Sequence, residues 1–508
     1  MNAFYITTPI YYVNDKPHIG HAYTTIACDI IARYNKLIGN DVYFLTGTDE
    51  HGQKVEKAAN AASLKPQEFV DKMSKNFQDL VSFLNCEIND FIRTTDDKHI
   101  NASQALWKKL LDNNQIYLSN YEGWYSVRDE AFYSENELIK KNDKYIAPSG
   151  AEVEWIKEES YFFKLSEWQD KLIDFYEKNP KAIKPQSRFN EVLSFIKGDL
   201  KDLSISRTTF KWGVPVPNND KHVMYVWIDA LCNYLTSIGY PDTNNKNYKK
   251  YWPGLHVVGK DILRFHSVYW PAFLMAADLE PPSRVFAHGW WTNEGKKISK
   301  SLGNIIDPYE VVLNYGLDQI RFFLFREVPF GNDGDFSKES IAQRINADLS
   351  NNFGNLVQRI CSFINKNCNS TVSNFVNFNE EDNKLITISI NKFDKYKQYM
   401  NEQNIDKSLK VVFELLTETN IYIDKQAPWI LKKTNLERMK VVLFVALEII
   451  RRTSLLLFPV IPDSCEKVFS ILNIDKKDIT LNNYQTMPSE PYKINEAFPV
   501  FPRIDIND

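Results

Sequence analysis

The chain has few cysteines, and none of them are spaced for a zinc knuckle or a disulfide framework. Its 508 residues contain six, at positions 28, 86, 232, 361, 368 and 465, and the smallest gap is the seven residues between Cys361 and Cys368. Zinc knuckles pair cysteines two to four residues apart, and small secreted domains pair theirs densely. We therefore expect scattered buried thiols in a reducing compartment.

Long hydrophobic runs and targeting signals are also missing. The longest apolar run, Val441–Ile450, is about half of the ~20 residues that a membrane helix needs, and it contains Glu448. The N-terminus shows no basic stretch followed by an apolar one, so no signal peptide is visible. We expect a soluble cytoplasmic protein that does not bind membranes.

An excess of one charge is absent as well. Lys and Arg total 61 and Asp and Glu total 65, giving a net charge of −4. This balance excludes a uniformly basic coat for nucleic acids but leaves room for a local basic groove. The hydrophobic fraction of 44% and the charged fraction of 25% are those of a globular protein. The length predicts about three domains.

The first 50 residues predict a strand, a helix and a second strand. Residues 3–8 (AFYITT) have the character of a buried strand, and the apolar spacing that follows is helical up to Gly39. Residues 41–46 (DVYFLT) predict the next strand. This order is typical of a βαβ unit and a parallel sheet, whose ligands bind at the carboxyl ends of the strands. The loops at those ends are Tyr11–His21 and Gly47–Lys54.

Later segments differ in character. Residues 116–221 alternate short aromatic-rich segments with turns and predict an α+β insertion, and strands are again expected at HVMYVWID (222–229) and LHVVGK (255–260). Long helices are expected from about 340 to 470, followed by an Asn-, Asp- and Pro-rich tail that we expect to pack loosely. No G-x-G-x-x-G follows a strand, which removes a simple dinucleotide-binding function.

Two histidines flank a glycine at the start of the first predicted helix, in the tetrapeptide His18-Ile-Gly20-His21. Their spacing places both imidazoles on one face, and Gly20 lets a ligand approach the backbone. A helix N-terminus favours a phosphate through its free N–H groups and its dipole. The same residues could be surface histidines or two ligands of a zinc ion, although no third Cys or His is near in sequence.

A basic, serine-containing loop lies about 280 residues downstream, at Lys296-Lys297-Ile-Ser-Lys300-Ser301. Lysine is a mobile point charge that suits a polyphosphate. Alone, this loop could be a solvated basic turn. Paired with the histidines, it predicts the second half of a charge clamp on a triphosphate. The rival phosphate loop, Gly254–Asp261, has Asp261 where a Walker loop needs Ser or Thr for Mg²⁺.

These motifs resemble the HIGH and KMSKS signatures of class I aminoacyl-tRNA synthetases. The chain is most similar to the methionyl-tRNA synthetase family, along nearly its whole length. The blocks that carry the likeness are TPIYYVNDKPHIGHAYT (8–24), LTGTDEHG (45–52), YVWIDAL (225–231), VVGKDILRFHSVYWPA (257–272), AHGWWTNEGKKISKSLGN (287–304) and DKQAPW (424–429).

The resemblance implies a fold class and a division of the chain. We expect an α/β protein with a class I Rossmann-like parallel-sheet catalytic domain, an α+β connective insertion and a C-terminal all-α anticodon-binding domain. The expected segments are 1–115 with 222–290 for the catalytic domain, 116–221 for the insertion, 291–345 for the KMSKS loop and stem-contact region, 346–470 for the anticodon-binding domain, and 471–508 for the tail.

The resemblance also implies an activity with named residues. Methionine would be activated by ATP, with Mg²⁺ on the triphosphate, and transferred to the 3′ end of methionine tRNA. Catalysis would rest on His18, His21, Lys297 and Lys300. ATP binding would add Asn14, Gly20 and Asp261, the last at the ribose. The methionine pocket would comprise Ile10, Tyr12, Asp49 (at the ammonium), Trp227, Ala230, Tyr234, Ile262, His266 and Trp270.

Aromatic rings suit the polarizable thioether of methionine, which supports this pocket on physical grounds. For tRNA, the resemblance implies that Asn351, Asn355 and Arg359 read the anticodon and that Trp429 stacks on a base. The three polar residues stand four apart, which keeps them along one face of a helix. Without the family context, a solvated polar face and a buried tryptophan would be the plainer interpretation.

Two departures from family patterns lead to further expectations. Many members carry cysteine knuckles in the insertion, whereas no cysteine occurs here between Cys86 and Cys232. We therefore expect no structural zinc and no protein metal ligand. Some members carry a dimerising C-terminal extension, and because this chain stops at 508 we expect a monomer.

Three rival functions remain open at this point. One is another class I synthetase, such as the cysteine enzyme, although the pocket lacks the cysteines that would hold its zinc. A second is a nucleotidylyltransferase, which shares the histidine motif but does not need the helical C-terminal third. The third is a catalytically silent tRNA-binding protein, against which the intact histidines and lysines argue. Amino-acid-dependent exchange of pyrophosphate into ATP separates all of them.

Overall fold

The chain folds into two compact units. A computed structural model describes residues 2–13, 15–126, 131–133, 135–141, 144–298, 304–373 and 378–504. Unit 1 consists of Met1–Phe4, His18–Val42 and His288–Asp508, and unit 2 consists of Tyr5–Pro17 and Tyr43–Ala287. Each unit is therefore assembled from segments that are distant in sequence.

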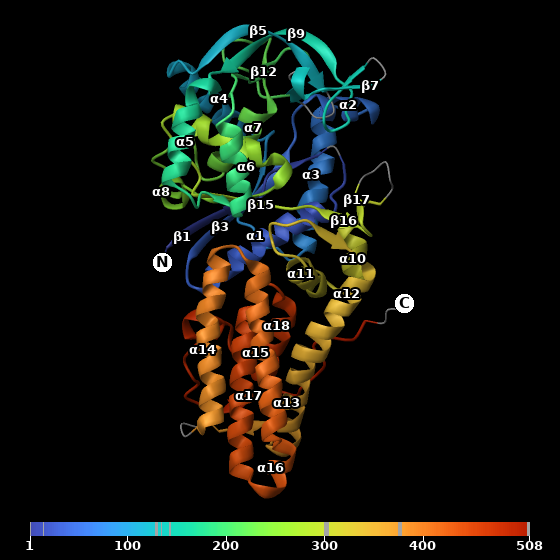
Figure 1. Cartoon of the computed structure of the whole chain (residues 1–508), viewed down its shortest axis with the longest axis vertical. Helices are drawn as coiled ribbons and strands as arrows, with labels where there is room; N and C mark the ends of the chain where they lie inside the picture. Colours follow the sequence, from blue (N-terminus) through green and yellow to red (C-terminus); the bar gives the residue numbers. More distant parts are fainter. Residues whose placement is uncertain are drawn as a thin grey trace. The chain divides into compact units, whose positions relative to one another are not determined.

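A seven-stranded sheet, most of whose residues belong to unit 2, confirms the predicted parallel-sheet fold (Figure 1). The strand order is β10-β15-β14-β1-β3-β2, with β4 also paired to β3. The registers of β1 with β14, β2 with β3, β3 with β4 and β10 with β15 are parallel. The strands are β1 (Ala3–Thr7), β2 (Tyr11–Tyr12), β3 (Asp41–Asp49), β4 (Asp90–Arg93), β10 (Ile183–Lys184), β14 (Leu255–Gly259) and β15 (Arg284–His288).

The insertion is built on a four-stranded antiparallel sheet, as the α+β pattern predicted. Its strand order is β11-β9-β5-β6, and Figure 1 shows the long strands β5 and β9 side by side. The chain then returns to the parallel sheet at β10 before the helix α6. The elements of this segment include β5 (Ile116–Ser126), β6 (Ala131–Tyr133), β7 (Ile139–Lys141), β8 (Lys144–Ile146), β9 (Glu154–Phe163), α5 (Gln169–Lys178), α6 (Gln186–Ile196), β11 (Leu203–Ser204) and β12 (Ser206–Arg207).

The strand predicted at 222–229 is wrong. Only β13 (Val223–Met224) is extended, and the helix α7 (Val226–Thr236) begins inside the predicted strand. A short apolar run does not distinguish a buried strand from a buried helix. Ten of the eleven residues of α7 are buried, so its sequence lacks the polar face that marks most helices. The other helices of unit 2 are α2 (Gln53–Ala61), α3 (Pro66–Phe83), α4 (Asp97–Asp112), α8 (Lys246–Tyr251) and α9 (Trp270–Ala276).

The helix α1 (Ile19–Leu37) lies in unit 1 and confirms the predicted first helix. It ends just before Gly39, whose φ of 87° lies in the left-handed region that favours glycine. Almost all of α1 is buried, and its one acidic residue, Asp29, is compensated by two arginines. Arg33 and Arg321 each donate to Oδ2 of Asp29, at 2.8 Å and 2.6 Å. A paired carboxylate can be buried without a large loss of stability.

The C-terminal half of unit 1 is helical, which confirms the predicted all-α domain (Figure 1). The long helices α14, α15 and α17 run side by side. The helices are α10 (Pro308–Tyr315), α11 (Leu317–Arg326), α12 (Lys338–Arg344), a π-helical segment (Ile345–Gly354), α13 (Asn355–Asn367), α14 (Glu380–Asn401), α15 (Ile405–Gln426), α16 (Pro428–Thr434), α17 (Leu436–Leu457) and α18 (Pro462–Leu472).

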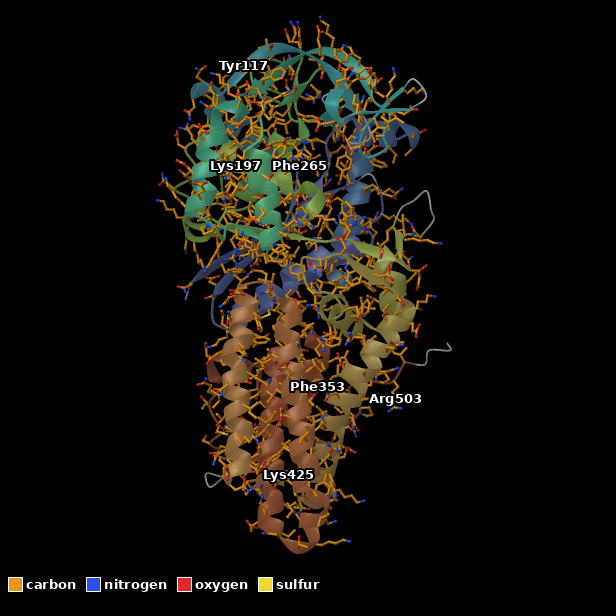
Figure 2. The ribbon with its side chains drawn as sticks, viewed as in Figure 1. Tyr117, Lys197, Phe265, Phe353, Lys425 and Arg503 are labelled. Carbon is orange, nitrogen blue, oxygen red and sulfur yellow. The ribbon has the colours of Figure 1, made fainter. Side chains whose placement is uncertain are left out.

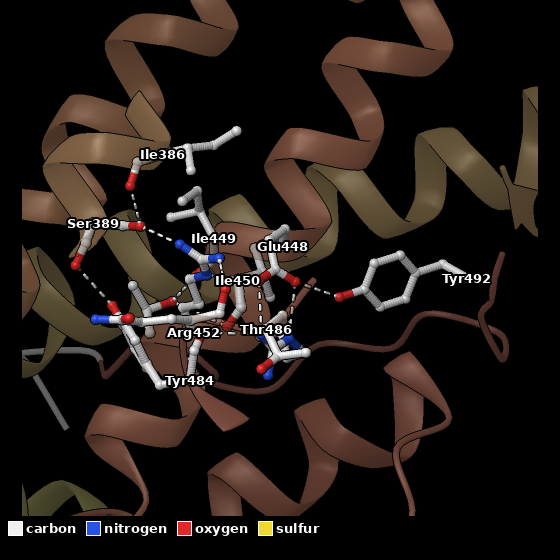
Figure 3. A network of polar contacts seen from close by, with 12 residues as sticks. Ile386, Ser389, Glu448, Ile449, Ile450, Arg452, Tyr484, Thr486 and Tyr492 are labelled. Atoms are coloured by element: carbon white, nitrogen blue, oxygen red, sulfur yellow. Dashed lines mark hydrogen bonds and ion pairs between the residues drawn. The ribbon is translucent and has the colours of Figure 1, made fainter. Parts of the chain in front are cut away.

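The expectation of a loosely packed tail beyond 470 is wrong. Tyr484 and Tyr492 are buried, and the hydroxyl of Tyr492 donates to the buried carboxylate of Glu448 on α17 at 2.9 Å. Arg451 and Arg452 also donate to Glu448, and both donate to backbone carbonyls of the tail (Figure 3). The expectation was based on the polar composition of the tail, whereas a few buried aromatic residues anchor the tail to the helices.

Candidate active site

Four predicted site residues lie at the carboxyl ends of neighbouring strands. Ile10 follows β1, Tyr12 ends β2, Asp49 ends β3 and Asp261 follows β14. Tyr12 and Asp49 are register partners in the parallel pair of β2 and β3. Because ligands of parallel sheets bind at this edge, the topology places these residues where the sequence predicted a site.

An ion pair with a buried carboxylate fixes the end of β3, where Asp49 lies. The next residue, Glu50, is fully buried and accepts two hydrogen bonds from the guanidinium of Arg93, at 2.7 Å and 2.9 Å. Thr95 donates to the same carboxylate at 2.5 Å. Bidentate pairs of this kind are strong and directional. Sequence reasoning missed Glu50 and Arg93 because they stand 43 positions apart and belong to no local pattern.

The pair Tyr234 and His266 provides a polar contact inside the predicted methionine pocket. The phenol oxygen of Tyr234 lies 2.7 Å from Nε2 of His266, and Nδ1 of His266 lies 2.9 Å from the carbonyl oxygen of Ile262. A carbonyl only accepts, so Nδ1 carries the hydrogen. Burial lowers the pKa of His266 to about 4, which leaves the ring neutral at pH 7. Tyr234 therefore donates its hydroxyl hydrogen to Nε2.

Aromatic and apolar side chains surround this polar pair. The ring of Trp270 lies 6.2 Å from that of Tyr234, and Ile10 and Trp227 pack against Ala230 in one apolar cluster. Trp227 stacks on Phe265, with ring centroids 3.4 Å apart and an interplanar angle of 13°. Phe265, labelled in Figure 2, was missed because one aromatic residue beside the predicted His266 carries no signal of its own.

A cavity of about 550 Å³ in unit 2 adjoins Trp227 and Phe265. Its lining includes residues of the insertion and the guanidinium of Arg207. Arg207 is 2% exposed, lies 3.8 Å from the ring centroid of Tyr225, and donates to Oγ of Ser204 at 2.7 Å. Its Nε lies 3.4 Å from Oε1 of the buried Glu158, so this carboxylate compensates the charge of the guanidinium. No sequence motif marks Arg207.

A second buried network joins the turn after β3 to α7. The carboxylate of Asp229 lies 2.7 Å from Nδ1 of His51 and 2.8 Å from Nε2 of His99. Burial alone would raise the pKa of Asp229, but the two imidazoles lower it to about 2. Asp229 lies between Trp227 and Ala230 in sequence, so the ionised carboxylate fixes the start of α7. These partners are up to 178 positions apart, and no local pattern in the sequence predicts their contact.

The HIGH tetrapeptide begins α1 in unit 1, as predicted. His18 is the N-cap residue, and its Nδ1 accepts a hydrogen bond from the backbone N–H of Gly20 at 3.0 Å. Nδ1 of His21 accepts from the backbone N–H of His18 at 3.0 Å, and the two rings lie 3.9 Å apart. Because both Nδ1 atoms accept, the neutral rings carry their hydrogens on Nε2. Partial burial and the neighbouring His18 lower the pKa of His21.

Residues on either side of the KISKS loop form hydrogen bonds with α1. The backbone N–H of Ile19 donates to the carbonyl of Ile306 at 3.1 Å, and Oγ1 of Thr24 lies 2.8 Å from Nε2 of His288. Lys296 and Lys297 form β17, which pairs with β16 (Trp291–Asn293). Residues 299–303, which include Lys300, and Asn14 lie outside the described part of the chain.

The predicted anticodon residues lie in the helical part of unit 1. Asn351 and Asn355 are exposed and line one groove with Arg503 of the tail, whose Nη2 donates to Asn351 at 2.7 Å. Figure 2 labels Arg503 and Phe353, which lies between Asn351 and Asn355 in the sequence. Arg359 donates to Asp424 and Asn420, both at 3.1 Å. Trp429 on α16 is 43% exposed, so it is not the buried tryptophan of the plainer interpretation.

Within the described ranges, no group of three His, Cys, Asp or Glu side chains is placed to hold a metal ion. In that same part of the chain, no helix has the length and apolarity needed to cross a membrane. The absence of structural zinc remains a prediction.

Comparisons with known proteins match nearly the whole chain. A family model described as "tRNA synthetases class I (M)" matches residues 4–361, and one described as "Anticodon binding domain of methionyl tRNA ligase" matches residues 372–491. A methionine–tRNA ligase of Rickettsia felis is 54% identical over 481 residues, covering 94% of this chain and 93% of that protein. One of Rickettsia bellii is 53% identical over 515 residues, covering 99% of each.

Solved structures agree with these matches. Mycobacterium tuberculosis methionyl-tRNA synthetase in complex with methionyl-adenylate superposes with a TM-score of 0.96 at 44% identity, covering 99% of this chain and 100% of that one. The free form of the same M. tuberculosis protein gives a TM-score of 0.90 at 42% identity, covering 99% of each chain.

Proposed function

The chain belongs to the methionyl-tRNA synthetase family and is a methionine–tRNA ligase, and on that premise we propose that its two reaction steps use the residues described above. In the first step the methionine carboxylate attacks the α-phosphorus of ATP, giving methionyl-adenylate and pyrophosphate. In the second, a ribose hydroxyl at the 3′ end of the tRNA attacks the carbonyl carbon of the adenylate, and AMP leaves.

The hydrogen bonds at the start of α1 support a role of His18 and His21 in binding ATP. Phosphate oxygens only accept hydrogen bonds, and both His18 and His21 in their neutral forms carry a hydrogen on Nε2. The N-terminus of α1 adds its dipole, and Gly20 allows the close approach of a phosphate. We assign the two imidazoles to the triphosphate, where they stabilise the charge that develops as pyrophosphate departs.

Other residues complete the proposed nucleotide site. Lys297 and Lys300 supply mobile positive charge to the pyrophosphate, and Asn14 contacts the nucleotide. Asp261, exposed just beyond β14, accepts from the ribose hydroxyls. Mg²⁺ enters with ATP and is held mainly by phosphate and water, so we assign it no protein ligand.

The methionine pocket follows from the chemistry of its walls. Asp49, at the end of β3, pairs with the ammonium group of the amino acid. Trp227, Trp270 and Tyr12 offer rings to the thioether, which favours aromatic neighbours. Tyr234 and His266, hydrogen-bonded to each other, line the sulfur end of the pocket, and Tyr12 supplies the polar contact to sulfur. Ile10, Ala230 and Ile262 close the apolar walls of the pocket.

Recognition of tRNA is proposed for the helical part of unit 1. Asn351, Asn355 and Arg359 contact the anticodon, and Trp429 stacks on one of its bases. Single-stranded loops are where the base edges of RNA can be read. We further propose that the protein acts as a monomer in the cytoplasm, without structural zinc.

A direct test measures the transfer of radiolabelled methionine to purified methionine tRNA in the presence of ATP and Mg²⁺. We expect acid-precipitable product that depends on ATP, on methionine and on the methionine anticodon. Formation of methionyl-adenylate without transfer to tRNA would contradict the proposed second step. Absence of both would contradict the whole proposal.

A further inference from the structure

A fully buried imidazole lies beneath the proposed methionine pocket. His256 is on β14, and its register partner in the parallel pair with β1 is Thr7. Oγ1 of Thr7 lies 2.9 Å from Nδ1 of His256, and neither side chain is exposed. The two central strands of the sheet thus fix the plane of this ring.

The ring of His256 in turn supports Tyr234. The two rings stack with centroids 4.0 Å apart and an interplanar angle of 25°. The phenol of Tyr234 then donates to His266, 2.7 Å away. A series of contacts thus runs from the sheet to the pocket: Thr7 is hydrogen-bonded to His256, His256 stacks on Tyr234, and Tyr234 is hydrogen-bonded to His266. A tilt of the His256 ring would therefore move the phenol oxygen of Tyr234.

Packing alone does not explain a histidine at this position. Nε2 of His256 is buried and has no hydrogen-bond partner among the described residues. Buried polar atoms are nearly always paired, so a leucine or phenylalanine would fill the same space without this cost. Burial and the nearby His266 hold the pKa of His256 well below its usual value, so the ring stays neutral against Tyr234.

We infer that His256 is a positioning residue for the selection of methionine, because it fixes the plane of the Tyr234 ring and with it the wall that Tyr234 and His266 present to the sulfur. The inference rests on the proposed function of the pocket. It assigns His256 no contact with substrate. The predicted effect is on the binding of the amino acid and on the discrimination of sulfur from a methylene group.

Three variants separate positioning from stability. His256→Leu removes the aromatic support, His256→Phe keeps a flat ring without the nitrogens, and Thr7→Val removes only the anchor of the imidazole. His222→Leu is the matched control, since His222 is also fully buried in unit 2 but is hydrogen-bonded to Ser206 instead. Pyrophosphate exchange gives KM for methionine, KM for ATP and the preference for methionine over norleucine, in which a methylene replaces sulfur.

We expect His256→Leu to raise KM for methionine about tenfold or more, because small misplacements of contact groups cost large factors in activity. KM for ATP should stay within twofold, and the preference for methionine over norleucine should fall. His256→Phe should recover most of the loss, and Thr7→Val should raise KM for methionine about threefold, as for the loss of one hydrogen bond. The control should lower thermal stability only.

A double-mutant cycle with Tyr234→Phe tests whether His256 affects methionine binding through Tyr234. If His256 acts through the phenol, His256→Leu should cost much less in the Tyr234→Phe background than in the wild type. Additive effects, or equal losses toward methionine and ATP, would overturn the inference. If His256→Leu does not fold, an unchanged KM for methionine in Thr7→Val would overturn it. Wild-type protein without methionine-dependent exchange would instead contradict the proposed function.

Discussion

Replacement of Trp429 by alanine should weaken the charging of tRNA and spare the formation of methionyl-adenylate. Trp429 lies at the second position of α16 and exposes 43% of its surface, so its ring is available to a base. Stacking of a base on an aromatic side chain contributes ~1–3 kcal/mol. At about 1.4 kcal/mol per factor of ten, kcat/KM for tRNA should fall about 5-fold to 140-fold.

The assay compares two reactions of the same protein preparation. Pyrophosphate exchange reports the first step without tRNA and should remain within twofold of the wild type. Aminoacylation at subsaturating tRNA reports the second and should show the loss. Because the side chain is half-exposed, the free energy of unfolding should change by less than about 1 kcal/mol.

Ile430 provides the matched control for this variant. It follows Trp429 on the same helix and is 57% exposed, so Ile430→Ala removes an exposed apolar side chain without removing a ring. We expect near wild-type charging from Ile430→Ala. Equal losses of exchange and charging in Trp429→Ala, or a loss in Ile430→Ala as large as in Trp429→Ala, would refute the stacking argument.

Four further predictions follow from the structure. His21→Asn keeps an acceptor for the backbone N–H of His18 but removes the Nε2 donor, and exchange should slow by about 10²–10³, as for the loss of one transition-state donor; wild-type rates would contradict the role. The buried His256 and His266 have lowered pKa values, so the free energy of unfolding should fall by up to about 1.4 kcal/mol per group and pH unit between pH 6.5 and 4, because the unfolded chain takes up those protons first; His256→Phe should show a shallower slope in chemical denaturation. Glu448→Gln should lower stability by about 3–5 kcal/mol, since it leaves the two arginines of its buried network uncompensated; a change below 1 kcal/mol would argue against that network. Elemental analysis of the purified protein should find less than about 0.1 zinc ion per chain, whereas a structural zinc site would give about one.

The elements that the sequence predicted are those with a local signal. Strand β1 and helix α1 were found because the periodicity of their apolar residues changes sharply and Gly39 marks the helix end. The helix α7 was missed because burial on nearly all sides leaves no polar face to set its period. The tail was misjudged from its composition, whereas its packing depends on Tyr484 and Tyr492.

The candidate site shows the same division. Residues within motifs, such as His18, His21 and Asp49, could be named from the sequence because spacing and family resemblance point to them directly. Their supporting partners could not. Asp229 joins His51 from 178 positions away, and His256 joins Thr7 from 249 positions away. Such contacts depend on strand order and helix packing, which no short pattern encodes.

Among the twenty amino acids, this protein should activate only methionine with ATP. The most direct test is pyrophosphate exchange into ATP, measured with each of the twenty amino acids in turn at equal concentration. We predict rapid exchange with methionine and a rate at least about 100-fold lower with each of the others, because the walls of the pocket suit a thioether side chain. Exchange driven best by another amino acid, or by none, would contradict this prediction.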